Sequence, residues 1–461
     1  MTQDVYNSPF DLVIKNGTVV TAHASFCADV AIRGRRIAAV GERLNGLKEL
    51  DATGLLVTPG AVDVHVHLNM SIGEGIYSAD DWFTGTRAAA LGGTTTVIDF
   101  VDAKPDEPLL HALTMRKVEA DVNSAIDYGL HMTIAPGDIP KLDQLQAVYD
   151  AGCASFKLYM AYGFRLTDDQ LWQALAAIQQ VGGLPVVHAE NWDVICTLIE
   201  QNLAAGNVSP EWHPRSRPAI MEGEAAGRVI DMATYLNVPL YVFHVSCGQV
   251  VERIAQARSK GLPIYGETCP QYLFLTDQAY SRPDVLGALP VCSPPLREQE
   301  HQDRLWQALV RNELQAVSTD HCPFTQAEKA KGLENYKLIP GGVPSIESRF
   351  SLLYSRGVMG GLFTLERWVD LCCTTPARLF GLQKKGEIAP GYDADLVLFD
   401  PNAQKRLSTE TLHERVDWTP YEGVVVNGWP SMTISRGELL VENGRFMGAR
   451  GRGEFVVRNL F

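Results

Sequence analysis

The sequence lacks several features that would mark out particular classes of protein. It has no apolar run long enough to cross a bilayer, and MTQDVYNSPF at its start lacks the basic and apolar segments of a signal peptide. It has no basic excess, because 40 lysines and arginines face 54 aspartates and glutamates, a formal net charge of -14. This acidity argues against nucleic acid and anionic membranes as partners. We therefore expect a cytoplasmic protein.

Cysteine motifs are missing as well. The nine cysteines are scattered, no two stand in a CxxC pair, and the adjacent Cys372 and Cys373 are sterically awkward partners for a disulfide. We therefore expect reduced and mostly buried thiols. Four cysteines fall near predicted strand ends and leave a soft-metal alternative open, namely Cys247, Cys269, Cys292 and Cys322.

The two ends of the chain look alike and differ from the middle. FDLVIKNGTVVTA near the start and VVVNGWPSMTISRGELLVENGRF near the end both read as short strands. Asn16–Gly17 is a strong hairpin signal, and further Asn-Gly pairs follow at Asn427–Gly428 and Asn443–Gly444. The simplest arrangement joins both ends in one small β-sandwich domain. We predict its N-terminal part at 1–58, a catalytic domain at 59–382, and its C-terminal part with a tail at 383–461.

The middle of the chain alternates strands and helices. We count eight strand candidates: VDVHVH, TTTVIDF, LHMTIAP, ASFKLYM, LPVVHAE, LYVFHVS, LPIYGET and LQAVSTD. Helical stretches between them end in glycine, and Asp80 and Thr167 are candidate N-caps for the first two. This repetition predicts a (β/α)8 TIM barrel within an α/β fold. A doubly wound open sheet is the alternative, but the P-loop and the GxGxxG motif that would support it are absent.

Chemically active side chains gather at the ends of these strands. In a parallel barrel the carboxyl ends of all strands share one face, and that face carries the active site. His65 and His67 stand two apart on one strand, so both imidazoles point to the same side. One such histidine is often structural, but a convergent set is hard to explain as packing. We therefore predict a metal site made of His65, His67, Lys157, His188, His244 and Asp320.

Lys157 needs a separate explanation. An ammonium group repels a metal cation, and burying it within ASFKLYM is costly unless it is paired or neutral. Reaction with CO2 would convert the amine into a carbamate anion whose two oxygens can bridge two divalent metals. The alternative is a lysine that snorkels to solvent or forms an ion pair.

Longer stretches resemble one family in order along the chain. TPGAVDVHVHL resembles the opening of the amidohydrolase superfamily barrel. The dihydropyrimidinase and hydantoinase branch of the cyclic amidohydrolases is matched by GTRAAALGGTTTVIDF, SFKLYMAY, RSRPAIMEGEAAGRVIDMA, VFHVSCGQ, ETCPQYL, CSPPLR and STDHCPF. In that family the six positions named above hold two zinc ions, with the lysine carbamylated as N6-carboxylysine, and none is substituted here. The resemblance implies hydrolysis of dihydropyrimidines or 5-substituted hydantoins to N-carbamoyl amino acids.

The resemblance also assigns catalytic and substrate contacts. Tyr162, five residues after the lysine, would donate a hydrogen bond to the oxyanion. Asp320 would take a proton from the attacking water and pass it to the leaving nitrogen. Ser293 in CSPPLR would contact the cyclic imide largely through its backbone. Gly341 in IPGGVPSIESR replaces the asparagine that is usual in the family. The NMSIGEGIYS loop after the HxH pair also departs from the usual MPFGGT type and would shape the pocket for the ring substituent.

Related families offer competing functions. Allantoinase and dihydroorotase use the same metal site, but the loop after HVHL lacks the EPG-type sequence associated with them. Collapsin-response-mediator proteins share the fold as non-catalytic interaction proteins, yet they have lost metal ligands that this chain retains. The expected partner is thus a small cyclic imide or ureide, and the family is commonly a homotetramer.

Overall fold

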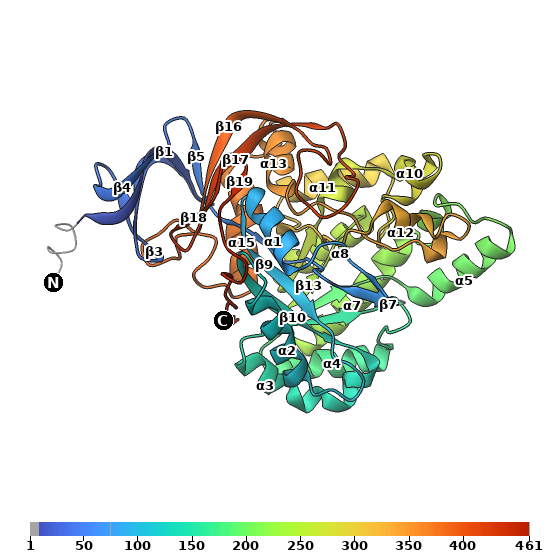
Figure 1. Ribbon diagram of the computed structural model, residues 1–461. Helices are drawn as coiled ribbons and strands as arrows, with labels where there is room; N and C mark the ends of the chain where they lie inside the picture. The colour runs from blue at the N-terminus through green and yellow to red at the C-terminus, as the bar shows by residue number, and fades with distance from the viewer. Residues whose placement is uncertain (1–8, 74, 461) are drawn as a thin grey trace.

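A computed structural model describes residues 9–73 and 75–460 of the 461-residue chain. The first eight residues of the predicted segment 1–58, together with Glu74 and Phe461, lie outside the described residues. Figure 1 shows a small sheet at one side of a larger body of strands and helices. Within the described ranges, no helix has the length and apolarity needed to cross a membrane.

The larger body is a barrel of eight parallel strands. Consecutive strands pair in chain order, from β6 to β15, and their bounds are β6 Ala61–Asp63, β9 Thr94–Val101, β10 Asp127–Ile134, β11 Ser155–Tyr159, β12 Leu184–His188, β13 Leu240–Val242, β14 Ile264–Thr268 and β15 Ala316–Val317. A parallel bridge between Val66 and His321 closes the barrel, with His67 N donating to His321 O at 2.9 Å. The (β/α)8 prediction is confirmed, and the open-sheet alternative is wrong because the first and last strands meet.

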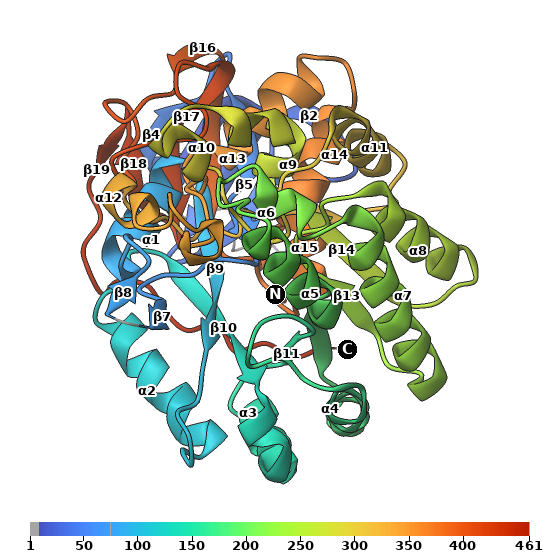
Figure 2. The same cartoon turned by 90° about the vertical axis from the view of Figure 1, so that its right-hand side faces the viewer.

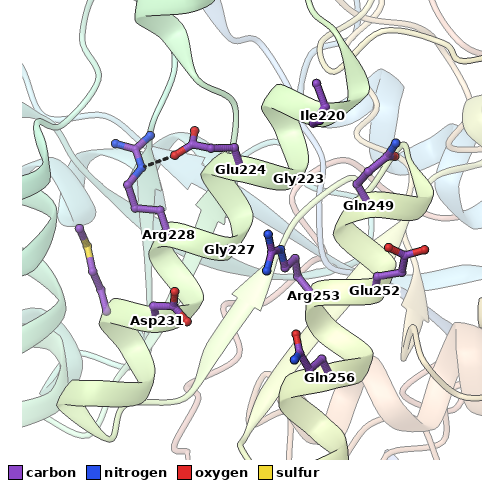
Figure 3. Close-up of a pocket in the computed structure, with 11 residues that line it drawn as sticks. Ile220, Gly223, Glu224, Gly227, Arg228, Asp231, Gln249, Glu252, Arg253 and Gln256 are labelled. Atoms are coloured by element: carbon purple, nitrogen blue, oxygen red, sulfur yellow. Dashed lines mark ion pairs between the residues drawn. The ribbon is translucent and has the colours of Figure 1, made fainter.

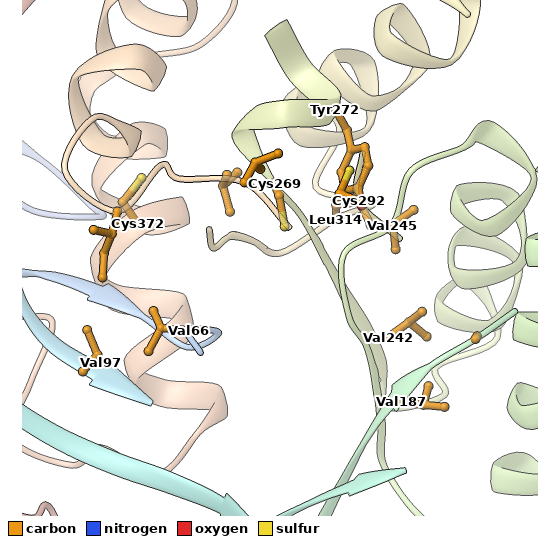
Figure 4. Close-up of a cluster of buried hydrophobic side chains, with 14 of the residues drawn as sticks. Val66, Val97, Val187, Val242, Val245, Cys269, Tyr272, Cys292, Leu314 and Cys372 are labelled. Atoms are coloured by element: carbon orange, nitrogen blue, oxygen red, sulfur yellow. The ribbon is translucent and has the colours of Figure 1, made fainter. Parts of the chain in front are cut away.

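Helices surround the barrel, as the view in Figure 2 shows. Their bounds are α1 Trp82–Leu91, α2 Leu109–Asp121, α3 Leu145–Asp150, α4 Asp168–Gln180, α5 Trp192–Ala204, α6 Trp212–Arg215, α7 Ala219–Leu236, α8 Gly248–Ser259, α9 Pro270–Phe274, α10 Val285–Ala288, α11 Gln299–Val310, α12 Gln326–Ala330, α13 Arg349–Leu353, α14 Leu365–Val369 and α15 Thr375–Leu379. Apolar side chains from strands and helices form the continuous core between them. Part of it appears in Figure 4, where Val187, Val242 and Val245 lie on one side and Val66 and Val97 on the other. This packing fixes the strand ends that carry the predicted site.

Both chain ends join in one nine-stranded mixed sheet, as the small domain prediction requires. Its strands are β1 Phe10–Val20, β2 Ser25–Arg33, β3 Arg36–Gly41, β4 Gly46–Asp51, β5 Leu56–Pro59, β16 Leu396–Arg406, β17 Val425–Ser435, β18 Glu438–Glu442 and β19 Arg445–Phe446. The two ends meet where β5 pairs antiparallel with β16. Buried side chains from both parts, such as Ile14, Val30, Leu396 and Ile434, form one cluster. The limits 1–58, 59–382 and 383–461 stay a prediction.

Of the three Asn-Gly pairs named in the sequence analysis, only one forms a hairpin turn. Asn443–Gly444 joins β18 to β19, with both residues at positive φ as a tight primed turn requires. The hairpin predicted at Asn16–Gly17 is wrong, because the pair lies inside β1 and produces a register shift against β2. Asn427–Gly428 likewise lies inside β17, opposite a register shift in β16. Positive φ at an Asn-Gly pair suits a bulge as well as a turn.

Of the two N-cap predictions, one is confirmed and one is wrong. Thr167 precedes α4, as predicted. The cap of α1 is Asp81 and not Asp80: Asp81 Oδ1 accepts from Thr84 N at 2.8 Å. Asp80 is buried and bonds with His321 instead, Oδ2 to Nε2 at 3.0 Å. All nine cysteines are free thiols and seven are buried, as predicted.

The segment after β19 crosses the floor of the barrel. The backbone of this segment forms two hydrogen bonds with Tyr128: Tyr128 N donates to Glu454 O, and Tyr128 O accepts from Val456 N. Arg458 is fully buried and donates to Leu130 O and, at 2.8 Å, to Ser155 Oγ. The amino ends of β10 and β11 are thereby held from below, and the opposite face of the barrel stays open for ligands.

Candidate active site

The structure brings all nine candidate residues to one cavity of about 620 Å³ at the carboxyl ends of the strands. Six of them are the predicted metal ligands and three the predicted substrate contacts: His65, His67, Lys157, His188, His244, Asp320, Tyr162, Ser293 and Gly341. They come from strand ends and the loops that follow them in different parts of the barrel, so the fold, and no local motif, assembles the site.

His65, His67 and Asp320 form the tightest group. The Nε2 atoms of His65 and His67 lie 3.0 Å and 3.1 Å from Oδ1 of Asp320. Their potential ligand atoms all lie within 4.8 Å of one another, close enough to hold a metal ion. Within the described part of the chain, the buried Nε2 atom of His65 has no partner with hydrogen-bond geometry, which suits a nitrogen that binds a metal ion. The donor set therefore fits a metal centre.

The charges in this group support one another. Burial disfavours the charged form of Asp320, yet His65 and His67 hold the pKa of the Asp320 carboxyl well below its ordinary value. Burial also opposes protonation of His65, but Asp320 and Glu267 outweigh it and raise the pKa of that imidazole. Asp320 is therefore an anion at neutral pH, as a metal ligand and a proton acceptor must be.

Two carboxylates that the sequence analysis missed orient the histidine rings. Glu267 Oε1 accepts from His65 Nδ1 at 2.8 Å, which turns Nε2 of that ring toward Asp320. Glu190 Oε2 lies 2.7 Å from His188 Nε2 and 2.6 Å from Nη1 of Arg217. Although burial opposes ionisation, Arg217 and His188 lower the pKa of Glu190 to about 2. Each carboxylate therefore holds one ring nitrogen and fixes the orientation of that imidazole.

His188 and His244 lie side by side, with ring centroids 4.5 Å apart. Burial lowers the pKa of both imidazoles, so each is neutral and able to ligate. The Lys157 amine lies near them among aromatic rings, 4.3 Å from the centroid of Phe243 and 4.7 Å from that of Tyr159. Burial lowers the pKa of Lys157 to about 7. A neutral amine is the form that reacts with CO2.

Three site residues adopt left-handed backbone conformations, in which φ is positive. They are Tyr162 at 73°, His244 at 38° and Asp320 at 51°. A residue other than glycine in this region costs about 1–3 kcal/mol, and the surrounding structure must impose it. Strain of this kind gathers where side chains are aimed at a reaction, and here it falls on a predicted oxyanion donor and two predicted ligands.

Tyr162 lies beside the metal-ligand group on the loop after β11. Its ring centroid is 5.2 Å from that of His188, and Trp192 and Phe164 pack near it. Burial raises the pKa of the Tyr162 phenol, so its hydroxyl keeps its proton and remains a donor; Ser293 bonds with it. The aromatic neighbours fix the ring, and the hydroxyl meets the loop that carries Ser293.

A second hollow, of about 870 Å³, lies outside the barrel between α7 and α8. Figure 3 shows charged and amide side chains along it, among them Glu224, Arg228, Glu252 and Arg253. Arg228 pairs with Glu224 at 3.2 Å, so part of this charge is already neutralised. None of the predicted site residues lines the hollow, and the chemistry belongs to the barrel cavity.

Comparison with known proteins agrees with this geometry. The model of the amidohydrolase family matches residues 56–440. The chain belongs to the amidohydrolase family. This amidohydrolase is 44% identical to D-hydantoinase of Geobacillus stearothermophilus, covering 97% of this chain and 96% of that protein. It is 40% identical to D-phenylhydantoinase of Escherichia coli K12, covering 98% of each chain.

Solved structures give the same assignment. The dihydropyrimidinase of Brevibacillus agri NCHU1002 superimposes with a TM-score of 0.95 at 44% identity, covering 97% of this chain and 99% of that one. The chain is therefore an amidohydrolase of the hydantoinase and dihydropyrimidinase branch and a cyclic amidohydrolase enzyme. The family is metal-dependent, and His65, His67 and Asp320 can hold a metal ion here.

Proposed function

We propose that this amidohydrolase hydrolyses the cyclic amide bond of dihydropyrimidines or 5-substituted hydantoins and releases N-carbamoyl amino acids. The observation that carries the proposal is the meeting of six potential metal ligands with Tyr162 and Ser293 in one cavity. Nearly full-length similarity to proteins named D-hydantoinase and dihydropyrimidinase supports it.

Two divalent ions, most simply Zn²⁺, would be held by His65, His67, Lys157, His188, His244 and Asp320. When bound, such ions would activate water and polarise the ring carbonyl. We propose that Lys157 carries a carbamate: its neutral amine attacks CO2, a nitrogen–carbon bond forms and one proton leaves. The pKa of about 7 at this buried amine favours that reaction near neutral pH. The resulting anion replaces an ammonium group that would repel the metals.

The remaining steps are assigned to the chain's own side chains. Asp320 accepts a proton from the attacking water and delivers it to the leaving ring nitrogen. Its carboxylate suits this role because it is ionised and lies within 3.1 Å of the Nε2 atoms of His65 and His67. Tyr162 donates its hydroxyl hydrogen to the carbonyl oxygen as negative charge develops there. Glu267 and Glu190 hold His65 and His188 in the orientations that these steps need.

Part of the cavity lining suits an apolar ring substituent. Met70, Ile72, Phe164, Trp192 and Leu338 all line it, so an aryl or alkyl group can be buried there. Gly341 leaves room as well, because a Cβ atom at that position would meet nothing closer than 3.9 Å. This lining favours 5-substituted hydantoins over unsubstituted rings.

A substrate panel tests the proposal. Zinc-loaded enzyme is incubated with dihydrouracil, hydantoin, 5-phenylhydantoin, allantoin and dihydroorotate, and N-carbamoyl products are separated by chromatography. We expect turnover of the first three, with 5-phenylhydantoin preferred. Preference for allantoin or dihydroorotate would instead support the allantoinase or dihydroorotase alternative. Absence of turnover on every ring, with both zinc ions bound, would favour a non-catalytic role like that of the collapsin-response-mediator proteins.

The assembly state and the location extend the same proposal. We propose a homotetramer, on the resemblance to the family alone, and a cytoplasmic location, as expected from the sequence. Light scattering after size-exclusion chromatography measures the first, and fractionation of the source cells measures the second.

A further inference from the structure

Lys329, in the short helix α12, is a buried lysine that the proposed chemistry does not use. Its side chain is fully buried, and its Nζ donates to Val291 O at 2.7 Å and to Gly342 O at 2.8 Å. In the described part of the chain no carboxylate pairs with it. Burying a lysine is unfavourable unless its donors are used, so these two carbonyls are the reason that it stays inside. Burial lowers the pKa of Lys329 to about 7, and both the amine and the ammonium form can supply two donors.

The two carbonyls belong to different segments of the cavity wall. Val291 lies two residues before Ser293, and Gly342 follows Gly341. Gly342 N also donates to Val291 O at 2.9 Å, so that oxygen receives two hydrogen bonds and ties the segments together directly. The position of Gly342 admits no side chain, because a Cβ atom there would lie 2.2 Å from Cys322 O. The backbone at Gly342 is therefore also packed tightly against the segment that carries Cys322.

The carbonyl groups on either side of Ser293 also accept hydrogen bonds from buried side chains. His213 Nε2 bonds with Cys292 O at 2.8 Å, and Tyr272 hydroxyl donates to Pro294 O at 2.7 Å. Over the described residues, no hydrogen bond is found on the backbone N–H or C=O of Ser293 or Gly341. Their neighbours are thus tied to the scaffold, whereas the peptide groups of Ser293 and Gly341 remain free beside the cavity.

The helix that carries Lys329 is itself anchored. Glu328 accepts from Thr325 N at 2.8 Å and closes the first turn of α12. Gln326 N donates to Asp417 Oδ1 at 2.9 Å, which links the helix to the segment after β16. These hydrogen bonds hold helix α12, and with it the backbone of Lys329, in place relative to the two loops.

We propose that Lys329 is a positioning residue for substrate recognition, which ties the Val291 and Gly342 carbonyls so that the peptide groups of Ser293 and Gly341 face the ring in one arrangement. This inference rests on the proposed function. The imide edge of a hydantoin or dihydropyrimidine alternates C=O and N–H groups, and fixed peptide N–H and C=O groups complement such an edge. Losing the tie would weaken binding of the ring equally in the ground state and the transition state.

The test compares Lys329→Met with Lys385→Met. Lys385 is an equally buried lysine that pairs with Asp127 at 2.6 Å and Asp395 at 2.7 Å, away from the cavity. For Lys329→Met we expect KM for hydantoin to rise about tenfold or more, with kcat within about threefold and zinc content unchanged. For Lys385→Met we expect a lower Tm and an unchanged KM. Should Lys329→Met not fold, Lys329→Gln, which keeps one donor group, is expected to raise KM by a smaller factor.

Two results would overturn the inference. One is a KM for Lys329→Met within about twofold of the parent value, because then the loops keep their places without the tie. The other is a loss confined to kcat. Hydantoin binding to the zinc-loaded parent is measured alongside by calorimetry. A parent that neither binds nor hydrolyses any ring would refute the proposed function itself, and the role of Lys329 would fall with it.

Discussion

Replacing Glu267 by glutamine tests how strongly a buried carboxylate outside the metal-ligand set controls metal affinity. Glu267 receives two hydrogen bonds, from His65 Nδ1 at 2.8 Å and from Tyr241 hydroxyl at 2.9 Å, and is fully buried. In Glu267→Gln the amide oxygen can still accept from His65, while the amide NH2 replaces the oxygen that accepts from Tyr241, so the tyrosine hydroxyl must turn and accept instead. What is lost is the negative charge that strengthens the bond and makes the opposite ring nitrogen a better electron donor.

The size of the effect follows from that difference. A hydrogen bond to a charged group contributes about 1.5–3 kcal/mol and a neutral one about 1 kcal/mol, so the substitution removes roughly 0.5–2 kcal/mol. At about 1.4 kcal/mol per factor of ten, the Kd for zinc should rise about tenfold. Competition with a chelating dye at pH 8 measures it. Tyr241→Phe is the matched control, because it removes the other hydrogen bond and keeps the carboxylate; its Kd should stay within about threefold.

At lower pH, the difference in zinc affinity between the parent and Glu267→Gln should become smaller. Asp320 and Glu267 raise the pKa of His65, so protons compete with zinc for the His65 ring in the parent as the pH falls. Glu267→Gln lowers that pKa, and the variant therefore loses less affinity between pH 8 and pH 6. A zinc Kd for Glu267→Gln within twofold of the parent at pH 8, or a larger loss in Tyr241→Phe, would refute the reasoning.

Three further predictions concern the groups assigned to the reaction. Lys157→Ala should lose most of its zinc and activity, and short carboxylic acids should restore part of the activity. In the parent enzyme, the rate at which metal-free protein is reactivated at a fixed CO2 concentration should rise with pH until about 7 and then level off, because only the neutral amine reacts. An unmodified ammonium in active, metal-loaded enzyme would contradict this. Asp320→Asn should retain zinc but lose most turnover, and near-normal turnover with both metals bound would show that its proton-transfer role is wrong. Tyr162→Phe should lower kcat about 10²–10³-fold with little change in KM, and steady-state kinetics within a few-fold of the parent would exclude an oxyanion role.

Much of the fold and the candidate site could be predicted from the sequence because both follow strand periodicity. The spacing of His65 and His67 put both rings on one face, and the barrel topology then placed distant strand ends such as His188 and Asp320 beside them. Strand β15 is shorter than predicted: only Ala316 and Val317 pair regularly, and Asp320, the last residue of the predicted strand, has a left-handed backbone. Left-handed backbone at an aspartate has no signature in a strand-like pattern.

The groups that orient the site could not be predicted in this way. Glu267 stands at a strand end, but its spacing carries no sign that it meets His65 across the barrel. Lys329 lies in TQAEKAKG, a polar stretch typical of a solvated helix, yet it is buried with its amine donating to the carbonyls of Val291 and Gly342. The choice of Asp81 over Asp80 as a helix cap depended on His321, which draws Asp80 into the interior. Each of these contacts is tertiary, and local sequence gives no periodicity for it.

The joining of β5 to β16 has a consequence for how the protein is made. Residues 56–59 leave the ribosome long before residues 396–399, their partners in the sheet, have been translated. During that interval the nascent chain displays an unpaired strand edge beside Val57, which is fully buried in the finished protein. Strand pairings this distant in sequence also form slowly. Overexpression should therefore place a heavy demand on chaperones, and slowing translation lengthens the exposure of that edge.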